Sequence, residues 1–104
     1  MARFDVYRHP LAKSRKSVPF LLSIQTDALD FLATRLVAPL VLEKAFGPRI
    51  PFLHPIVPIG GDRLVVAMNE LVAVDRTLLG GPVFNIREAA SEIVAALDYL
   101  VSGY

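Results

Sequence analysis

The chain has 104 residues, the size of one domain, and its lack of cysteine excludes a disulfide framework and thiolate metal sites. Hydrophobic residues make up 54% of the sequence and the mean hydropathy is +0.50, but no apolar run approaches the roughly 18 residues that a membrane-spanning helix needs. The first residues contain no apolar core of a secretory signal. We therefore expect a single cytoplasmic domain over residues 1–104 that does not enter a membrane. Because so small a domain buries a limited share of its surface, the apolar excess also favours a homodimer.

Charge is distributed unevenly along the chain. The net charge of +1 does not suggest direct binding of nucleic acid. Residues 1–16, however, carry five basic side chains against Asp5 alone, a local net charge of +4, whereas residues 85–104 carry a net charge of −2. The basic segment is interpreted either as a solvated loop or as a surface for an acidic partner segment.

The N-terminal third predicts two strands and a turn. "RFDVYR" (3–8) alternates between inward and outward residues, which is strand periodicity. Residues 9–17 are a polar connection, and "VPFLLSIQ" (18–25) reads as a strand covered on both faces for part of its length. In the turn that follows, Asp27 and Asp30 can hydrogen-bond the local backbone.

The middle of the chain predicts four further strands, two of them in a hairpin. "TRLVAPLVL" (34–42) is expected to be a strand that is irregular at Pro39, because sheets tolerate proline mainly at edges and bulges. Residues 53–68 predict a hairpin around Gly60-Gly61-Asp62, whose residue types accept positive φ easily. A strand is also expected within "NELVAVDRTLLGG" (69–81).

The last element is expected to be a helix over about 86–101. Asn85 is a candidate N-cap with Glu88 in the capping-box position, and Gly103 stands where a helix commonly ends. Apolar residues recur at spacings of three, four and seven, which is one stripe of a helix: Ile86, Ala89, Ala90, Ile93, Ala96, Leu97 and Leu100. Antiparallel strands followed by one helix predict the α+β class.

The residues provide little for catalysis or for binding metals. His9 and His54 each precede a proline, and their spacing matches no zinc motif. A structural role is expected for His54. There is no phosphate-binding glycine loop and no nucleophile elbow. The Asp27 and Asp30 pair is interpreted as local capping. We therefore expect a binding protein without cofactor or metal, and no catalytic residues.

Several stretches together resemble the CcdB family, the toxins of plasmid addiction pairs. They are "FDVY", "IQTDALDFLATRLVAPL", "LHPIVPIGGDRLVVAMNELVAV" and a final helix that ends in x-Gly-x. The resemblance implies a twisted antiparallel sheet of the SH3-like barrel type, with a small second sheet and a C-terminal helix, similar to the toxins MazF and Kid. It also implies a homodimer that binds the DNA gyrase A subunit and traps the cleaved DNA complex. A CcdA-like antitoxin neutralises such a toxin, and the pair is associated with plasmid maintenance and transcription regulation.

Carried over position by position, the resemblance predicts a gyrase-binding surface. The surface for the antitoxin is predicted separately, at the basic segment. The gyrase-binding positions are Ala28, Leu29, Asp98, Ser102, Gly103 and Tyr104. Ser102 stands where the family has a tryptophan that stacks on the gyrase site, and Ala28 and Asp98 also differ from the family pattern. The candidate antitoxin contacts are Arg8, Lys13, Arg15 and Lys16, whose charge would attract an acidic disordered peptide.

Two alternatives accompany this reading. The departures from the family pattern suggest a non-toxic or retargeted homologue that still binds an antitoxin. Fold similarity to MazF suggests a ribonuclease, in which Arg3, Arg8 or Arg35 would act with an acid such as Asp5.

Overall fold

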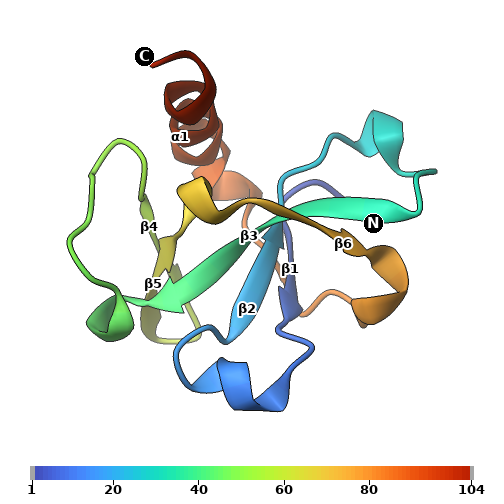
Figure 1. Cartoon of the computed structure of the whole chain (residues 1–104), viewed down its shortest axis with the longest axis horizontal. Helices are drawn as coiled ribbons and strands as arrows, with labels where there is room; N and C mark the ends of the chain where they lie inside the picture. Colours follow the sequence, from blue (N-terminus) through green and yellow to red (C-terminus); the bar gives the residue numbers. More distant parts are fainter. Residues whose placement is uncertain (1, 104) are drawn as a thin grey trace.

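The computed structural model describes residues 2–103, which form one antiparallel sheet and one α-helix (Figure 1). The strand order is β4-β5-β3-β2-β1-β7, and β6 pairs with β3 off this path. This architecture confirms the predicted α+β class. The bounds are β1 Asp5–Arg8, β2 Phe20–Ser23, β3 Thr34–Leu42, β4 Ile56–Ile59, β5 Asp62–Val66, β6 Val72–Asp75, β7 Phe84–Asn85 and α1 Ala90–Ser102.

Strand β3 is the branch point of the sheet. One of its edges pairs with β2, while its other edge pairs first with β6 over residues 34–37 and then with β5 over residues 40–42. The small second sheet of the prediction therefore takes the form of a branch that remains hydrogen-bonded to β3. Pro39 lies where the partner changes from β6 to β5, and its carbonyl accepts a hydrogen bond from the Ala67 N–H at 2.9 Å. The N–H and C=O of one strand residue face the same edge of a sheet. The Pro39 nitrogen, which carries no hydrogen, therefore faces the gap between β6 and β5.

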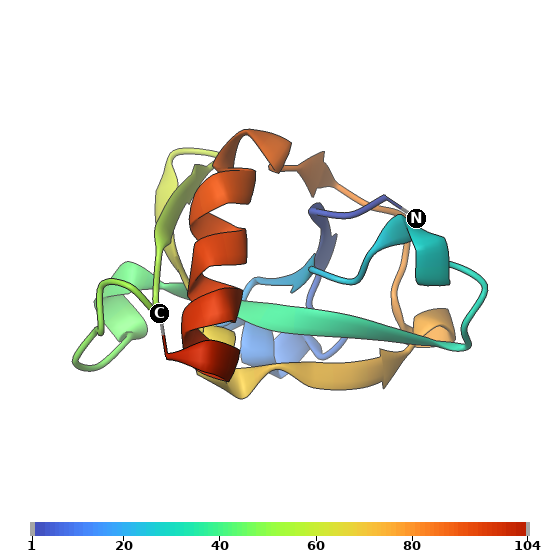
Figure 2. The same ribbon diagram turned by 90° about the horizontal axis from the view of Figure 1, so that it is seen from above.

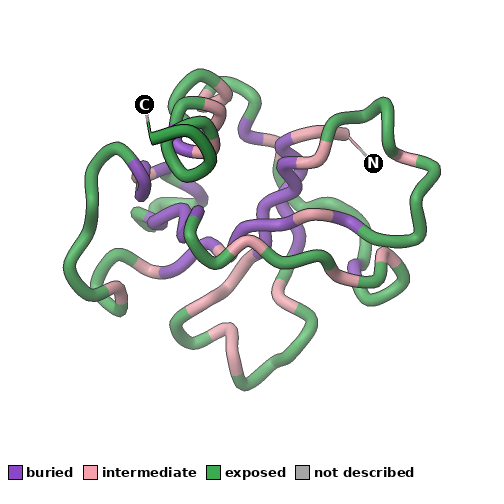
Figure 3. Tube along the Cα trace, turned by 45° about the horizontal axis from the view of Figure 1, so that its top comes forward, coloured by how far each residue is buried: buried purple, intermediate pink, exposed green. Residues whose placement is uncertain are grey.

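Both faces of the central strands are buried. The larger cluster fills the space between the sheet and α1 and includes Val6, Leu22, Leu40, Met68 and Ile93. Figure 2 shows α1 lying across this face of the sheet. A smaller cluster covers part of the opposite face and contains Tyr7, Leu21, Val37 and Leu79. Neighbouring strand residues point to opposite faces, so the burial of both Leu21 and Leu22 confirms that β2 is covered on both sides (Figure 3).

Helix α1 begins four residues later than the stripe predicts. A 3₁₀ turn over Arg87–Ala89 precedes it, and its N-cap, Ala89, has no side-chain hydrogen bond. Asn85 caps this turn instead, because its Oδ1 accepts the Arg87 N–H at 3.1 Å while its Nδ2 donates to the Arg3 carbonyl and to Asp5. These bonds tie Asn85 to the sheet and delay the helix.

The predicted turns at Gly60-Gly61 and Gly103 are confirmed. Gly60 and Gly61 have φ values of 58° and 87°, as a two-residue type I′ hairpin turn requires. Gly103 has φ 81° and its N–H donates to the Tyr99 carbonyl at 2.9 Å, which closes the end of α1 in the left-handed conformation. Over residues 2–103, no helix combines the length and apolar character needed to cross a membrane.

Shorter elements differ from the prediction in extent. The strand expected within 69–81 is limited to β6, because 3₁₀ turns at Met68–Glu70 and Arg76–Leu78 bound it on both sides. The polar connection 9–17 contains another 3₁₀ turn, Ala12–Lys16. The two-residue strand β7, which pairs with β1 through Asp5 and Val6, was not predicted. It is too short to give a periodic signal.

Candidate functional site

The carboxyl-terminal end of α1 exposes apolar and small residues. Val101 is 75% exposed and Leu100 39%, while Asp98, Ser102 and Gly103 are also exposed. Leu97 packs against the core, so it contributes to closing the protomer, but Val101 does not. The predicted contact at Tyr104 lies outside the described residues. The described part of the predicted helix tip is therefore accessible to a partner.

The turn that carries Ala28 and Leu29 is a 3₁₀ turn, Asp27–Leu29, fixed at both ends. At its start, the Asp27 carboxylate accepts the Arg3 N–H at 2.6 Å, so this aspartate holds the N-terminal segment. The side chain that caps the turn is Thr26, whose Oγ1 accepts the Ala28 N–H at 3.4 Å, and not the predicted Asp27. At its end, Asp30 forms an ion pair with Arg35 at 2.5 Å. The backbone carbonyl of Asp30 also accepts from Arg76 at 2.7 Å. Ala28 and Leu29 are thus exposed on a rigid turn.

The structure does not bring the two halves of the predicted gyrase surface together within one protomer. Figures 1 and 2 both show the turn that contains Ala28 and Leu29 at the opposite end of the molecule from the carboxyl end of α1. The chain measures 34 × 32 × 21 Å along its principal axes. The two halves of the predicted surface therefore lie on opposite sides of one protomer.

A buried polar cluster occupies the face of the sheet that α1 does not cover. Arg35 is only 2% exposed, and Asp5 is 7% exposed. The Asp5 carboxylate accepts from Asn85 Nδ2 at 2.9 Å and lies 3.5 Å from the Tyr7 hydroxyl. Burial, and then the nearby Asp5 carboxylate, raise the pKa of Tyr7 to about 12. Asp5 and Arg35, two groups that the ribonuclease alternative would use, are thus placed inside the fold.

Two of the four basic residues predicted to bind an antitoxin line one pocket. Arg8 and Arg15 flank a cavity of about 400 Å³ whose other lining is apolar and includes Phe20 and Phe84. These two rings meet edge to face with their centroids 5.8 Å apart. Lys13 and Lys16 lie on the same 3₁₀ turn as Arg15 but do not line this cavity. The structure therefore combines cationic and apolar groups at Arg8 and Arg15.

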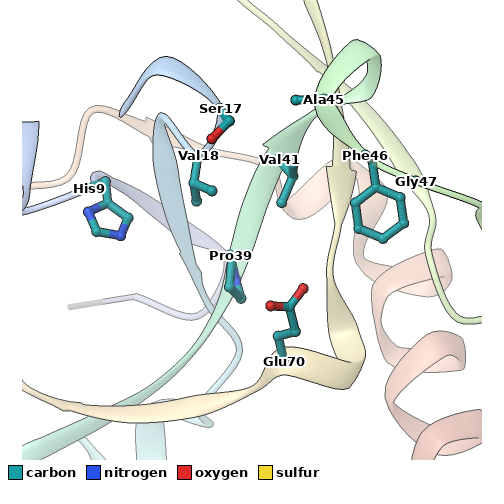
Figure 4. Close-up of a pocket in the computed structure, with 9 residues that line it drawn as sticks. All are labelled: His9, Ser17, Val18, Pro39, Val41, Ala45, Phe46, Gly47 and Glu70. Atoms are coloured by element: carbon teal, nitrogen blue, oxygen red, sulfur yellow. The ribbon is translucent and has the colours of Figure 1, made fainter. Parts of the chain in front are cut away.

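A second cavity, of about 530 Å³, lies over β3 beside the basic segment (Figure 4). Its floor is formed by Val18, Pro39 and Val41, and its polar groups include His9 and Glu70. His9 Nδ1 accepts the Leu11 N–H at 3.0 Å. Partial burial, and then the charge of Arg15, lower the pKa of His9 and favour the neutral ring.

The arrangement in this cavity is not that of a nucleophile beside a base. Ser17 and Glu70 line it together with His9, but no side-chain hydrogen bond joins any two of the three. Within residues 2–103, no three His, Asp or Glu side chains gather closely enough to hold a metal ion. Among the side-chain clusters described here for residues 2–103, none has the geometry of nucleophilic catalysis.

One exposed aromatic pair was missed by the sequence analysis. Phe52, in the loop between β3 and β4, is 76% exposed, and its ring centroid lies 6.2 Å from that of Tyr99 on α1. The available signal was the position of this phenylalanine between Pro51 and Pro55. The sequence of this loop has no strand or helix periodicity that would place the ring on a buried face. The pair extends the exposed surface at the end of α1.

A curled antiparallel sheet with one C-terminal helix packed on it is the architecture that the resemblance to the CcdB toxins implies. The family model described as CcdB protein matches residues 3–103. The chain therefore belongs to the CcdB family and to the toxins of CcdA–CcdB toxin–antitoxin pairs. A comparison with individual characterised proteins gives no match.

Proposed function

We propose that this toxin acts by binding the DNA gyrase A subunit and trapping the enzyme on cleaved DNA, without catalysis of its own. The observation that supports this proposal is the exposed carboxyl end of α1, where Leu100 and Val101 remain outside the core beside Ser102 and Gly103. Apolar side chains this exposed in a chain of the CcdB family are suited to a protein partner. The cytoplasm, where gyrase acts, is the proposed location.

A homodimer would reconcile the separated halves of the gyrase surface. In one protomer the turn with Ala28 and Leu29 lies far from Asp98 and Ser102 (Figure 2). A twofold assembly doubles each surface and allows one partner to contact the helix end of one protomer and the turn of the other. We therefore propose that the functional unit is a dimer and that gyrase contacts both protomers.

The cavity between Arg8 and Arg15 supports the proposal of an acidic, partly disordered CcdA-like antitoxin. A carboxylate of the antitoxin would pair with either guanidinium, and an adjacent apolar side chain would pack on Phe20 and Phe84. Two like charges at one cavity mouth attract an acidic segment more strongly than scattered surface cations do. The antitoxin contact is thus proposed at Arg8 and Arg15, with Lys13 and Lys16 adding long-range attraction.

The test of gyrase poisoning is expression in a gyrase-sensitive strain, combined with supercoiling and cleavage assays on purified gyrase. We expect a growth defect and stabilised cleaved DNA. Normal growth together with absence of cleaved DNA would exclude gyrase poisoning and leave the retargeted homologue that binds only an antitoxin. No observation favours the ribonuclease alternative, since Asp5 and Arg35 are buried.

A gain-of-function variant tests the role of position 102. Ser102 is exposed, so Ser102→Trp can be accommodated without repacking the core. A tryptophan anchor commonly contributes 2 kcal/mol or more, on the order of a 30-fold gain in affinity. We expect stronger toxicity than for the natural chain, measured as a lower inducer concentration for growth arrest. Unchanged toxicity would show that Ser102 does not limit activity.

A further inference from the structure

The cavity that contains Phe20 and Phe84 has a neighbour of similar size. The neighbour, which we call the loop cavity, has a volume of about 380 Å³, against about 400 Å³ for the first, which we call the aromatic cavity. Both cavities are lined by Arg8, Arg15 and Val83, so they meet at these three residues. The remaining lining of the loop cavity consists of Pro10, Leu78, Gly80 and Gly81.

The apolar walls of the loop cavity are held by hydrogen bonds and by the core. Asp75 Oδ1 accepts the Thr77 N–H at 2.9 Å and the Thr77 hydroxyl at 2.8 Å, which fixes the 3₁₀ turn that carries Leu78. The next residue, Leu79, is buried in the smaller core cluster, whereas Leu78 is 60% exposed. Val83 is tied to the sheet because its N–H donates to a carbonyl of β1 at 2.8 Å. Leu78 and Val83 are therefore presented to solvent from fixed positions.

Positive charge is concentrated where the two cavities meet. Arg15 is half-buried, and its Nε donates to the His9 carbonyl at 2.6 Å, which holds this side chain against the end of β1. Arg8 is the last residue of β1 and is exposed. Lys13 and Lys16 lie on the same 3₁₀ turn as Arg15 and add to the local charge. Among the described residues that line either cavity, none is acidic, so the field at this surface attracts an anion.

Exposed apolar side chains surround the same two arginines. Val83 is 43% exposed and Phe84 is 44% exposed, in addition to Leu78. A purely acidic segment would leave these apolar groups in water, and a purely apolar segment would cover two guanidinium groups without supplying a counter-charge. A peptide that carries a carboxylate between two apolar side chains meets both requirements, because each recess admits one side chain. Charge and shape therefore select an occupant that is acidic and apolar at once.

We propose that the antitoxin presents an apolar–acidic–apolar segment, with one apolar side chain in the aromatic cavity and the other in the loop cavity. The carboxylate between them accepts hydrogen bonds from Arg8 and Arg15, which line both cavities. The contact thus extends past Phe84 to Leu78. The inference rests on the proposed function, because it gives the chemistry of the segment that the proposed antitoxin would use.

The first test uses synthetic acidic peptides of equal length and equal charge, with no leucine, one leucine or two leucines beside a central glutamate. The spacing between the two leucines is varied from two to five residues, which covers extended and helical peptides. Affinity for the full chain is measured by calorimetry at low salt. We expect the first leucine to lower Kd about tenfold and the second, at its best spacing, to lower it about tenfold again.

The second test removes one cavity wall at a time. Leu78→Ala should raise Kd for the two-leucine peptide about fivefold, close to the Kd of the one-leucine peptide, and should leave the peptide without leucine within about twofold. Phe84→Ala should have the same effect through the aromatic cavity. The matched control is Leu11→Ala, since Leu11 is 55% exposed beside the basic turn but lines neither cavity. A thermal melt verifies that each variant is folded.

The outcomes separate the inference from the proposed function. Equal affinity for all the peptides would overturn both cavity contacts while an acidic antitoxin still binds by charge. If the second leucine adds nothing at any spacing, or if Leu78→Ala and Leu11→Ala are indistinguishable, the loop cavity is overturned. If no peptide binds at low salt, the inference and the proposed antitoxin surface are overturned together.

A lipid surface is the other class of partner that combines apolar groups with negative charge. Sedimentation of the chain with phosphatidylcholine vesicles that contain phosphatidylglycerol distinguishes it from a peptide. We expect no co-sedimentation beyond that of Leu78→Ala. Vesicle binding that is lost in Leu78→Ala, in the absence of peptide binding, would overturn the inference and assign the two cavities to a membrane contact.

Discussion

Arg35 is the largest side chain that the described fold buries almost completely, and its environment explains how the cation is tolerated. Its guanidinium pairs with the Asp30 carboxylate at 2.5 Å and also donates to the Asp30 carbonyl at 3.1 Å. Since the Asp30 side chain remains 42% exposed, solvent screens part of this attraction. The pair joins the start of β3 to the turn that carries Ala28 and Leu29. Arg35 therefore acts as a positioning residue for that turn.

Removal of the counter-charge is expected to destabilise the fold. Asp30→Asn leaves the buried guanidinium without its carboxylate, so we expect a loss of about 1.5–3 kcal/mol in the free energy of unfolding, measured by denaturant titration. The control is Glu43→Gln, which breaks the ion pair between Glu43 and Arg63 on the surface. Both partners of that pair are exposed, so little change is expected. Equal effects of the two substitutions would show that Arg35 does not depend on Asp30.

Tyr7 gives the fold a specific alkaline limit. Its pKa is raised to about 12 by burial and by Asp5, compared with 10.0 for an ordinary tyrosine. Because the folded state holds the proton more tightly, the stabilisation is fully present below pH 10 and is lost as the pH rises through 12. We expect the free energy of unfolding to fall over this interval by on the order of 2 kcal/mol.

The measurement is denaturant unfolding at several pH values between 9 and 12, together with the ultraviolet titration of tyrosinate. In Tyr7→Phe the decline attributable to this residue should disappear, because phenylalanine has no proton to lose. An unchanged decline in that variant would assign the alkaline loss to other groups.

At the scale of elements, the loop between β3 and β4 shows how one buried imidazole orders a segment with no regular structure. His54 accepts from the Ile50 N–H and engages Asn69 with its other nitrogen. Its own N–H donates to the Ile50 carbonyl at 2.8 Å. The loop is therefore closed from both ends by a single residue, in agreement with the structural role predicted for it.

Replacement of His54 should loosen this loop selectively. His54→Leu leaves the Ile50 N–H and the Asn69 side chain without their partner, so we expect a loss of about 1–3 kcal/mol in stability. Hydrogen exchange should accelerate at the Ile50 amide and much less at amides of β1 and β2, which lie in the core of the sheet. Uniform acceleration would indicate global rather than local unfolding.

Elements with a strong periodic or turn signal were predictable, and those set by distant contacts were not. The hairpin at Gly60-Gly61 and the helix end at Gly103 follow from local backbone preferences, so the sequence indicated both. The start of α1 did not follow, because Asn85 is engaged by β1 and by Arg3, which are far away in the chain. The apolar stripe predicted where the helix lies. It does not show that contacts with distant residues hold Asn85 away from the helix N-terminus.

The candidate site was predictable to a similar extent. Basic charge in residues 1–16 and the resemblance at the helix end located two surfaces. The selection of Arg8 and Arg15 over Lys13 and Lys16 depends on where Phe20 and Phe84 meet in space. Phe52 reaches Tyr99 only through the loop closure at His54. Contacts of this kind between residues about 45 or more positions apart leave no local pattern.

At the scale of the whole molecule, opposite charges occupy separate ends. The basic segment around Arg15 lies below the sheet in Figure 1, and the acidic helix with Glu92 and Asp98 lies above it. Under the proposed function, an acidic antitoxin segment would be attracted to the basic end, away from the surface of α1 proposed to bind gyrase. Such a separation would allow the antitoxin to dock before gyrase is released.

Salt dependence tests this division. Binding of a synthetic acidic peptide that represents the proposed antitoxin segment should weaken as salt rises, since exposed charges are screened over about 8–10 Å. We expect Arg8→Ala and Arg15→Ala each to raise Kd about fivefold or more, and Lys13→Ala and Lys16→Ala to raise it about twofold, because the lysines do not line the cavity. Calorimetry at two salt concentrations measures both effects. Equal losses for all four variants would indicate diffuse attraction without a defined pocket.

The left-handed turn at Gly103 restricts how the tip of this toxin can change over evolutionary time. With φ at 81°, the backbone there adopts a conformation that every residue with a Cβ disfavours, so the direction in which the chain leaves α1 is tied to one amino acid. Position 102 is under no such restriction, and serine or tryptophan can stand there on the same path. Under the proposed function, target preference would drift through position 102 while the left-handed glycine beside it stays fixed.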